Sequence, residues 1–416
     1  MPANLRPIGT SLQAARPIVQ RKGTGLPKNV VITGVGRSAV GRKLQRGGLS
    51  LTVEAIRDAL DNSGLSLRDI DGLSSWPGQN LAMKGMAPIG VPQVKEALRL
   101  ELDWFSGGAE TAGQLGAFIN ACAAVEAGMA RHVLVFRTVT ESTVQAAERA
   151  APPKEGGAQG MPGGMQWQLP FYAMSATNWI ALYAAAHFHR YGTTREQLGQ
   201  IALNGRRNAM LNPSALMRTP LTLDDYLASR MISTPLCLLD CDMPADGSVA
   251  VIVSRREAAG DLKHRPITVE SLAGAMHGRD SWDQFTDLAS IQSHDDSARL
   301  MWSRTDLKPS DVDFGEIYDG FSFLTLAWLE SLGFCGRGEG GAFLEGGQRI
   351  SREGSLPINT DGGQLSGVRL HGYGFIYETC KQLWGEAGER QLTGKHEVAV
   401  AAIGGGSQAA CALFTH

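Results

Sequence analysis

The sequence predicts an α/β protein built from two similar halves, and two observations support this prediction. The stretches SGLSLRDIDGLSSW (63–76) and RTDLKPSDVDFGEIYD (304–319) share one spacing of leucine, aspartate and apolar residues, in which Leu65 matches Leu307. A repeat of this length indicates two related domains rather than a solenoid of short units. Short runs rich in valine and isoleucine also alternate with helical segments, which is typical of strands covered by helices.

The two halves are expected to contain corresponding elements. In the first half we expect strands at 29–36, 70–76, 132–139 and 247–254, and helices at 51–62 and 112–127. In the second half we expect strands at 267–275, 315–320, 397–406 and 410–416, and helices at 293–304 and from 322 and 374. The helix at 112–127 is apolar on all sides, so it should be buried. Because helices separate most strands, we expect largely parallel sheets covered on both faces.

These patterns divide the chain into three parts. A tail at 1–28 carries basic residues and prolines without an acidic residue, and we expect it to be flexible. The N-terminal half covers 29–263 and the C-terminal half covers 264–416. Within the first half, the region at about 140–220 begins with APPKEGGAQGMPGG and continues with helical patterns. We expect this region to be an inserted loop domain.

The composition argues against several classes of protein. The chain has 416 residues, of which 43% are hydrophobic, and its net charge of −2 favours neither a nucleic acid nor an anionic membrane as a partner. No apolar run has the length of a membrane span. The cysteines lack the spacing of a zinc site, so we expect no metal, free thiols and a cytoplasmic location. They are Cys122, Cys237, Cys241, Cys335, Cys380 and Cys411.

The stretch NTDGGQLSGVRLHGYGFIYE (359–378) has features of the wall of a binding site. Arg369, His371 and Tyr373 occupy every second position, and alternate side chains of an extended segment point to one side. The surrounding glycines allow tight turns and a close approach of the backbone to another group. A plain glycine-rich connection has the same composition, so the stretch alone leaves both interpretations open.

Five strings carry a resemblance to a known family. They are GRRNAMLNPSALM, PLCLLDCDMPADGSVAVIV, EIYDGFSFLTLAWLESLGFCGRGEGG, NTDGGQLSG and AAIGGG. In this order they resemble the thiolase superfamily, and above all its sterol-carrier-type thiolases and lipid-transfer-type homologues, over nearly the whole chain from about residue 29. The resemblance implies a thiolase fold, in which two tandem βαβαβ halves form a layered αβαβα arrangement with a loop-domain insertion.

The chain departs from the thiolases at the residues that transfer an acyl group. If Gly113 is the glycine of the Cys-x-x-Gly motif, Glu110 stands at the nucleophile position, or Thr111 if the register shifts by one. Neither side chain can act as the low-pKa thiolate that accepts an acyl group. Ala402 stands where the family has its acid–base cysteine. The resemblance therefore does not imply acyl transfer through these positions.

Tyrosines stand at or beside the altered positions. Tyr318 occupies the place of the thiolase Asn or His that binds the thioester oxygen. Arg369 replaces the first histidine of the Gly-His-x-His-Gly turn, His371 matches the second, and Tyr373 follows. The tyrosine pair resembles the steroid side-chain-cleaving aldolases, which are thiolase homologues that cleave a β-hydroxyacyl-CoA without a covalent intermediate.

This resemblance implies a retro-aldolase, which is a carbon–carbon lyase. Its expected substrate is a CoA thioester with a steroid-like β-carbon, and its expected products are a ketone and a short acyl-CoA. The implied catalytic residues are Tyr318, Tyr373 and His371, and the implied substrate-binding residues are Asp319, Arg369, Gly404 and Gly405. No covalently bound cofactor is implied. Arg369 is a candidate for shifting a tyrosine pKa, and which tyrosine is the base stays open.

Other interpretations also remain open at this stage. A divergent acyltransferase would use another cysteine, such as Cys241 or Cys335, and a non-catalytic acyl-CoA-binding subunit would also lack the thiolase nucleophile. Glu110 would either cap the buried helix, where an anion is favourable, or face the pocket. The resemblance further implies a homodimer through an edge strand near 104–112, and a hetero-oligomer with a small accessory protein of OB-fold and zinc-ribbon type.

Overall fold

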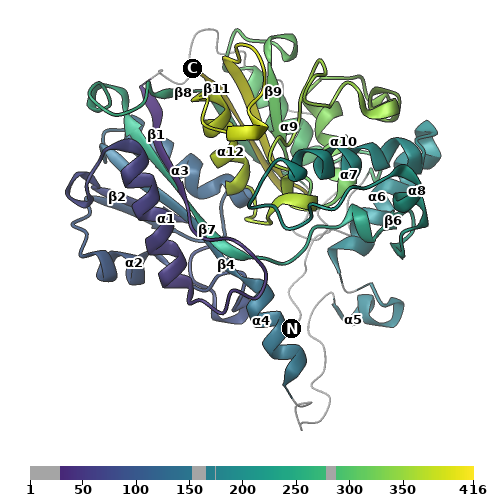
Figure 1. Cartoon of the computed structure of the whole chain (residues 1–416), viewed down its shortest axis with the longest axis horizontal. Helices are drawn as coiled ribbons and strands as arrows, with labels where there is room; N and C mark the ends of the chain where they lie inside the picture. Colours follow the sequence, from purple (N-terminus) through teal and green to yellow (C-terminus); the bar gives the residue numbers. More distant parts are fainter. Residues whose placement is uncertain (1–28, 152–164, 174, 278–286) are drawn as a thin grey trace, which may run out of the picture.

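The computed structural model describes residues 29–151, 165–173, 175–277 and 287–416 (Figure 1). The predicted tail at 1–28 and the glycine- and proline-rich start of the predicted insertion lie outside the described residues. The strands are β1 (Val30–Arg37), β2 (Gly72–Ser75), β3 (Trp104–Gly107), β4 (His132–Thr140), β5 (Met231–Ser233), β6 (Leu236–Cys237), β7 (Asp246–Arg255), β8 (Ile267–Met276), β9 (Phe314–Ile317), β10 (Val398–Gly404) and β11 (Gln408–Thr415). The helices are α1 (Gly48–Ser63), α2 (Val91–Leu98), α3 (Gly116–Glu126), α4 (Glu141–Ala150), α5 (Met165–Gln168), α6 (Ala176–Tyr191), α7 (Arg195–Met210), α8 (Leu223–Ala228), α9 (Gln292–Trp302), α10 (Ser322–Ser331), α11 (Gly340–Leu344) and α12 (Tyr373–Leu383).

Nine strands form one sheet in the order β3-β2-β4-β7-β1-β8-β11-β10-β9. Outward from the centre, the first half runs β1-β7-β4-β2 and the second runs β8-β11-β10-β9. The repeated stretches therefore occupy equivalent places, since β2 and β9 belong to them. The halves are joined where Val31 and Ile32 of β1 pair with β8. The expected fold with two tandem halves is confirmed, whereas the boundary between 263 and 264 stays a prediction.

The expectation of largely parallel sheets is wrong. β2 pairs in parallel with β3 and with β4, and β9 pairs in parallel with β10, but the other pairings of this sheet are antiparallel. The length of the connecting segment explains one of the antiparallel pairings directly. Only three residues join β10 to β11, and a parallel partner needs a long crossover connection.

The first-half strands are covered on both faces. Leu134 and Phe136 of β4 share a core cluster with Ile56 of α1, whereas Val135 of the same strand belongs to the cluster that includes α3. This division follows from the alternation of side chains along a strand. A Cβ atom at Gly36 would lie 2.1 Å from the backbone nitrogen of Ala59. Glycine at this position therefore lets α1 lie directly on β1.

α3 and α12 form the middle layer of the molecule, which lies between the strands of the two halves (Figure 1). α3 packs on β2, β4 and β7, while α12 packs on β9 and β10 and also on β1 and β7. α9 covers β8 and β11, and α10 packs against α9. The predicted helix at 112–127 is a short 3₁₀ turn, Gly113–Leu115, followed by α3. No helix in the described part of the chain is long and apolar enough to cross a membrane.

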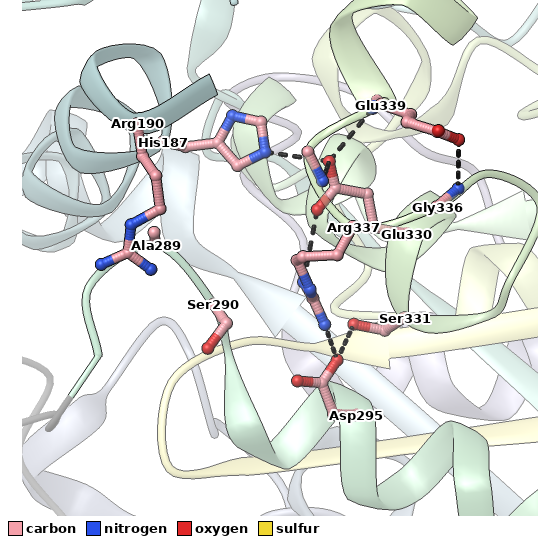
Figure 2. Close-up of polar contacts among 12 residues, drawn as sticks. His187, Arg190, Ala289, Ser290, Asp295, Glu330, Ser331, Gly336, Arg337 and Glu339 are labelled. Atoms are coloured by element: carbon pink, nitrogen blue, oxygen red, sulfur yellow. Dashed lines mark hydrogen bonds and ion pairs between the residues drawn. The ribbon is translucent and has the colours of Figure 1, made fainter. Parts of the chain in front are cut away.

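A buried carboxylate ties α6, α9 and α10 together (Figure 2). Oε1 of Glu330 lies 2.9 Å from Nε2 of His187 and accepts the backbone N–H groups of Gly338 and of Gly340, where α11 begins. Oε2 of Glu330 accepts from Arg337, which also pairs with Asp295 of α9 (Figure 2). This network fastens the helical part of the insertion to the second half.

Candidate active site

Tyr318 follows directly after β9, where the strand ends. Its backbone N–H donates to the carbonyl oxygen of Ala402 on β10 at 2.8 Å. Nε2 of Gln114, from the turn before α3, donates to the Tyr318 hydroxyl at 3.1 Å. Burial raises the pKa of Tyr318 to about 12, and the Gln114 donor opposes part of the rise. The phenol is therefore neutral at neutral pH and is held by a residue from the other half of the chain.

The loop that begins at Asn359 is held against the end of β9 and Tyr318. Two side chains, those of Asn359 and Asp319, hold it there. Asn359 accepts from the N–H of Ile317 at 2.7 Å and donates to its carbonyl at 2.8 Å, as an added strand would. Asp319 accepts backbone N–H groups at the start of the π-helical turn Gly363–Gly367. A Cβ atom at Gly363 would lie 2.2 Å from that carboxylate.

Asp319 therefore acts on the loop. Its two oxygens accept the N–H groups of Gln364 and Leu365, and burial raises its pKa to about 8. Both oxygens of Asp319 therefore already have backbone partners. Its predicted role in substrate binding stays a prediction.

The inserted region holds the same loop from its other side. Three asparagines and one arginine, from the string GRRNAMLNPSALM and the residue just before it, donate to backbone carbonyls of 358–361 and to the Ser366 hydroxyl: Asn204, Asn208, Asn212 and Arg206. All four are buried. Buried polar groups cost free energy unless they are hydrogen-bonded, so these contacts specify one position for the loop.

Glu141, the first residue of α4, joins two of the predicted site residues. Its Oε2 lies 3.1 Å from Nε2 of His371 and accepts from Nη2 of Arg369. Nη1 of Arg369 donates to Asp242 at 3.1 Å. Although burial opposes it, His371 and Arg369 bring the pKa of Glu141 well below its ordinary value. Arg369 is thus held between two carboxylates, and its predicted role in substrate binding stays a prediction.

His371 presents a ring nitrogen that is free to accept a hydrogen bond. Burial, and next the charge of Arg137, lower the pKa of His371 to about 4, so the ring is neutral at neutral pH. Because Nε2 faces the ionised Glu141, Nε2 carries the hydrogen and Nδ1 carries the lone pair. Nδ1 is buried and has no partner among the described residues. It can therefore accept a hydrogen bond or a proton from a bound molecule.

Tyr373, the first residue of α12, is fully buried. Its hydroxyl lies beside the backbone of Phe118 on α3 but makes no well-formed hydrogen bond within the described part of the chain. Burial raises the pKa of Tyr373, and the charge of Arg137 on β4 opposes this rise. Arg137 also interacts electrostatically with Tyr318. For Tyr373 the neighbouring cation is therefore Arg137, whereas the expected Arg369 opposes the rise in the pKa of Tyr318.

Buried polar atoms without partners gather around these residues. Among the described residues they include Nε1 of Trp76, Oε1 of Gln114, Nε and Nη2 of Arg137, Nε2 of Gln364, Nε of Arg369, Nδ1 of His371 and the hydroxyl of Tyr373. Proteins satisfy the great majority of their buried polar groups. Such a concentration is typical of a place where a bound molecule completes the hydrogen bonds.

Gly404 and Gly405 lie where β10 ends, two and three residues after Ala402. The carbonyl oxygen of Gly404 accepts from Nε1 of Trp328 at 3.1 Å and lies 3.0 Å from Nε2 of His294. The φ angle of 100° at Gly404 favours glycine there. These contacts hold the turn next to Tyr318, and the predicted binding role of both glycines stays a prediction.

Glu110 does not cap the buried helix. The helix begins at Gly113 without a side-chain cap, and Glu110 is exposed. With Met276 and Gln408 it lines a surface hollow of about 520 Å³. The residue that meets Tyr318 is Gln114, from the turn Gly113–Leu115.

All six cysteines are free thiols, and none has the properties of a nucleophile. Burial raises the pKa of Cys241 and of Cys335 to about 12. Cys122 lies near Tyr373, but burial raises its pKa as well. Since the thiolate is the reactive form, these environments do not favour acyl transfer. The described residues also contain no group of three or more His, Cys, Asp or Glu side chains that could hold a metal ion.

Comparison with known proteins agrees with this architecture. Residues 274–415 match the family model described as Thiolase C-terminal domain-like. The chain is 32% identical to the 17-hydroxy-3-oxo-4-pregnene-20-carboxyl-CoA lyase of Mycobacterium tuberculosis, over 86% of this chain and 92% of the relative. The chain belongs to the thiolase superfamily. The steroid side-chain-cleaving aldolase of Thermomonospora curvata is also 32% identical, over 86% of this chain and 91% of its own.

A solved structure extends the likeness to three dimensions. The Ltp2-ChsH2(DUF35) aldolase superimposes with a TM-score of 0.83 at 29% identity, over 94% of this chain and 98% of that one. The protein described by this sequence is a carbon–carbon lyase of the superfamily, since its relatives along most of the chain are lyases and aldolases. The resemblance and the enzyme class predicted from the sequence are thereby confirmed.

Sequence reasoning missed three residues of the site: Gln114, Arg137 and Glu141. Arg137 had a usable signal, because it is the only Lys, Arg, Asp or Glu in the apolar strand β4, and a charged residue is rarely buried without a reason. Glu141 follows a strand, and Gln114 precedes a helix. Polar residues are common at both kinds of position. Their spacing in the sequence does not reveal which loops they meet.

Proposed function

We propose that this lyase is a retro-aldolase that cleaves a β-hydroxyacyl-CoA of the steroid side-chain class into a ketone and a short acyl-CoA. The observation that carries the proposal is a cluster of unsatisfied buried polar groups that includes the Tyr373 hydroxyl, surrounds Tyr318 and contains no reactive thiol. The substrate class is carried over from the relatives, which are named for a pregnene-carboxyl-CoA and for steroid side chains.

The reaction needs a base, a group that holds an oxyanion and an acid. The base takes the proton of the β-hydroxyl, and the oxygen forms the ketone as the Cα–Cβ bond breaks. The electron pair of that bond passes to the thioester as an enolate, and the acid then protonates Cα. Atoms balance without water or a consumed cofactor, so the CoA thioester enters only as the substrate.

The site offers groups for these roles. Tyr318 and Tyr373 are neutral phenols at neutral pH, because burial raises both pKa values. They can donate protons, and either can act as a base after losing its own proton. His371 supplies the Nδ1 lone pair, and Glu141 fixes the orientation of its ring. We propose that the three residues share the proton transfers.

The acyltransferase alternative is less well supported by the site. It requires a thiolate, yet burial raises the pKa of both Cys241 and Cys335 to about 12. A non-catalytic acyl-CoA-binding subunit would need no buried tyrosine pair with neighbouring unsatisfied donors. These two functions remain as outcomes that the following experiment separates.

The test is incubation of the purified protein with a 17-hydroxy steroid C22-oyl-CoA, with detection of the steroid ketone and propionyl-CoA by mass spectrometry. We expect both products in equal amounts, and none with the double variant Tyr318→Phe/Tyr373→Phe. Saturable binding without either product, in the presence of the accessory protein, would favour the non-catalytic subunit. An acyl group trapped on a thiol would favour the acyltransferase.

We also propose two kinds of partner. A small accessory protein of OB-fold and zinc-ribbon type would bind this chain, and support comes from the solved Ltp2-ChsH2(DUF35) aldolase, whose name joins two components. A homodimer would form through β3, which lies at one end of the sheet and, among the described strands, pairs only with β2. The cytoplasmic location likewise stays a prediction.

A further inference from the structure

Arg137 is a buried cation whose guanidinium group is only partly hydrogen-bonded within the described part of the chain. It lies on the same side of β4 as Val135 and Val139, so it points into the layer that contains α3 and α12. Its side chain is 1% exposed. No carboxylate forms an ion pair with it among the described residues, although such a charge is costly to bury. A fold that keeps this arginine has a use for its charge.

The unused donors of Arg137 form a fork. Nη1 donates to the carbonyl oxygens of Met86 at 2.6 Å and Thr138 at 3.2 Å. Nε and Nη2, by contrast, have no partner in the described part of the chain. These two nitrogens share one edge of the planar guanidinium, and their parallel N–H bonds match an oxyanion. One edge of the guanidinium is therefore anchored, and the other is available to a ligand.

The fork belongs to the same neighbourhood as the predicted catalytic residues. The guanidinium carbon lies 5.1 Å from the ring centre of Trp76, and that ring lies 6.5 Å from the ring of His371. The titratable groups that lie close enough to interact electrostatically with Arg137 are Glu141, Tyr373, Arg369 and Tyr318. Glu141 is already engaged with His371 and Arg369, so it does not occupy the fork.

We propose that Arg137 is a further catalytic residue, whose Nε–H and Nη2–H groups hold the thioester oxygen while it carries the negative charge of the enolate. The inference rests on the proposed retro-aldol function. Arg137 only donates hydrogen bonds and loses no proton in the step. The electron pair of the broken Cα–Cβ bond places charge on the oxygen, and the charge disappears when Cα is protonated.

Arg369 does not serve this role. Both of its terminal nitrogens are engaged by Glu141 and Asp242, and only Nε lacks a partner among the described residues. A preorganised pair of donors in a site that excludes water stabilises an oxyanion more than a single donor does. Of the two buried guanidinium groups of the site, only Arg137 presents such a pair.

The experiment measures enolate formation without cleavage. Acetoacetyl-CoA is the probe, because its enolate has an ultraviolet band that the keto form lacks. We expect the wild-type protein to increase this band on binding. Arg137→Met and Arg137→Lys should each reduce the bound enolate at least about tenfold, since loss of one oxyanion donor typically costs about 100- to 1,000-fold in rate. The matched control is Arg304→Lys, whose arginine also anchors to a carbonyl, that of Leu272.

Two sets of results decide the inference. A wild-type protein that binds acetoacetyl-CoA without an enolate band, or folded Arg137 variants that keep the band, would overturn it. If Arg137→Met fails to fold, Arg137→Ala with added guanidinium ion replaces it, and recovery of the band by guanidinium but not by methylammonium supports the fork. An Arg137-dependent band in a protein that cleaves no steroid thioester would leave this inference standing and overturn only the proposed function.

Discussion

Nε2 of His371 lies 3.1 Å from Oε2 of Glu141, although 230 residues separate them along the chain. Glu141 also pairs with Arg369, so one carboxylate at the start of α4 orients two residues of the glycine-rich loop. The alternation of Arg369 and His371 thus has a structural consequence, because both side chains reach the same carboxylate. The loop therefore contributes to a buried polar cluster, and its role as the wall of a binding site stays a prediction.

Replacing Glu141 with Gln should lower both activity and stability while keeping the shape of the side chain. We expect a decrease in kcat of at least about tenfold and a loss of about 1–3 kcal/mol in the free energy of unfolding, which is typical of a buried hydrogen-bonding group that loses its charged partner. Urea unfolding and steady-state cleavage measure the two effects. Glu148→Gln on the exposed side of the same helix is the control, and it should change neither.

The same variant should alter the pH dependence of stability. The pKa of Glu141 is lower in the folded protein than its ordinary value. Its stabilising contribution is therefore present above the unfolded pKa and is lost as pH falls through the folded pKa. Urea titrations between about pH 7 and about pH 3 should show a smaller loss for Glu141→Gln than for the wild type. Equal losses in both proteins would show that the carboxylate is not ionised in this ion pair.

Tyr318→Phe and Tyr373→Phe should each lose at least about two orders of magnitude in turnover, which is the usual contribution of a general acid or base. The rings remain, so the thermal midpoints should stay close to that of the wild type. Because the two hydroxyls act in one sequence of proton transfers, the double variant should be far from additive. His371→Ala should have a milder effect if His371 only orients the loop.

A buried tyrosine outside the site provides the control. The hydroxyl of Tyr226 donates to Asp240 at 2.8 Å, so Tyr226→Phe should lower stability and leave the turnover of the folded protein unchanged. Near wild-type cleavage by both site variants, on a verified substrate, would remove Tyr318 and Tyr373 from the chemistry.

No cysteine should be required for turnover. Single replacements by Ser or Ala remove the thiols of Cys122, Cys237, Cys241, Cys335, Cys380 and Cys411 in turn. Those at buried positions should lower stability, because they leave a polar atom or a cavity in the core. The specific activity of the folded fraction, measured after size-exclusion chromatography, should stay largely intact. A folded but inactive cysteine variant would return the protein to the acyltransferases.

The protein should be a homodimer that uses the free edge of β3. Phe105 on this edge strand is 69% exposed, and an exposed strand edge readily pairs with another chain. Light scattering at micromolar concentration should show a dimer, and Phe105→Asp should weaken it at least about tenfold. Phe171→Asp, which changes an equally apolar and 80% exposed residue of the insertion, should not. A monomeric wild type, with or without its accessory protein, would contradict the prediction.

Glu330→Gln should destabilise the protein without changing its chemistry. The Glu330 carboxylate is fully buried, lies 2.9 Å from Nε2 of His187 and forms an ion pair with Arg337 (Figure 2). Removing one partner of a buried pair costs about 3–5 kcal/mol, and we expect a loss near the lower end because Arg337 keeps Asp295. Chemical unfolding and kcat measure the two effects. Glu339→Gln, at an exposed carboxylate of the loop between α10 and α11, is the control.

The acid sensitivity of this network has a definite sign. Burial raises the pKa of Glu330, but His187 and the backbone N–H groups outweigh it and bring the pKa below its ordinary value. The contribution is therefore lost as pH falls and is retained at neutral pH. A variant that is as sensitive to acid as the wild type would assign the loss to other carboxylates.

Much of this protein is determined by local patterns in the sequence. The spacing around Leu65 and Leu307 predicted the repeat, and β2 and β9 occupy equivalent places in the sheet. Apolar runs predicted the buried strands and α3, since side-chain periodicity is a property of neighbouring residues. The family strings predicted the thiolase fold and the lyase class, because they preserve residue types at fixed spacing.

The tertiary structure alone decided which distant groups meet. Antiparallel pairing of β4 with β7 depends on the path of the long connection between them, which local propensity does not specify. The contacts of Glu141 with His371 and of Gln114 with Tyr318 join the two halves of the chain, and the sequence contains no spacing that encodes them. Burial is also a collective property, which is why the unpaired fork of Arg137 became visible only after β4, α3 and α12 had packed together. Hydrogen bonds and charges act over a few ångströms of space, whereas sequence patterns report only distance along the chain.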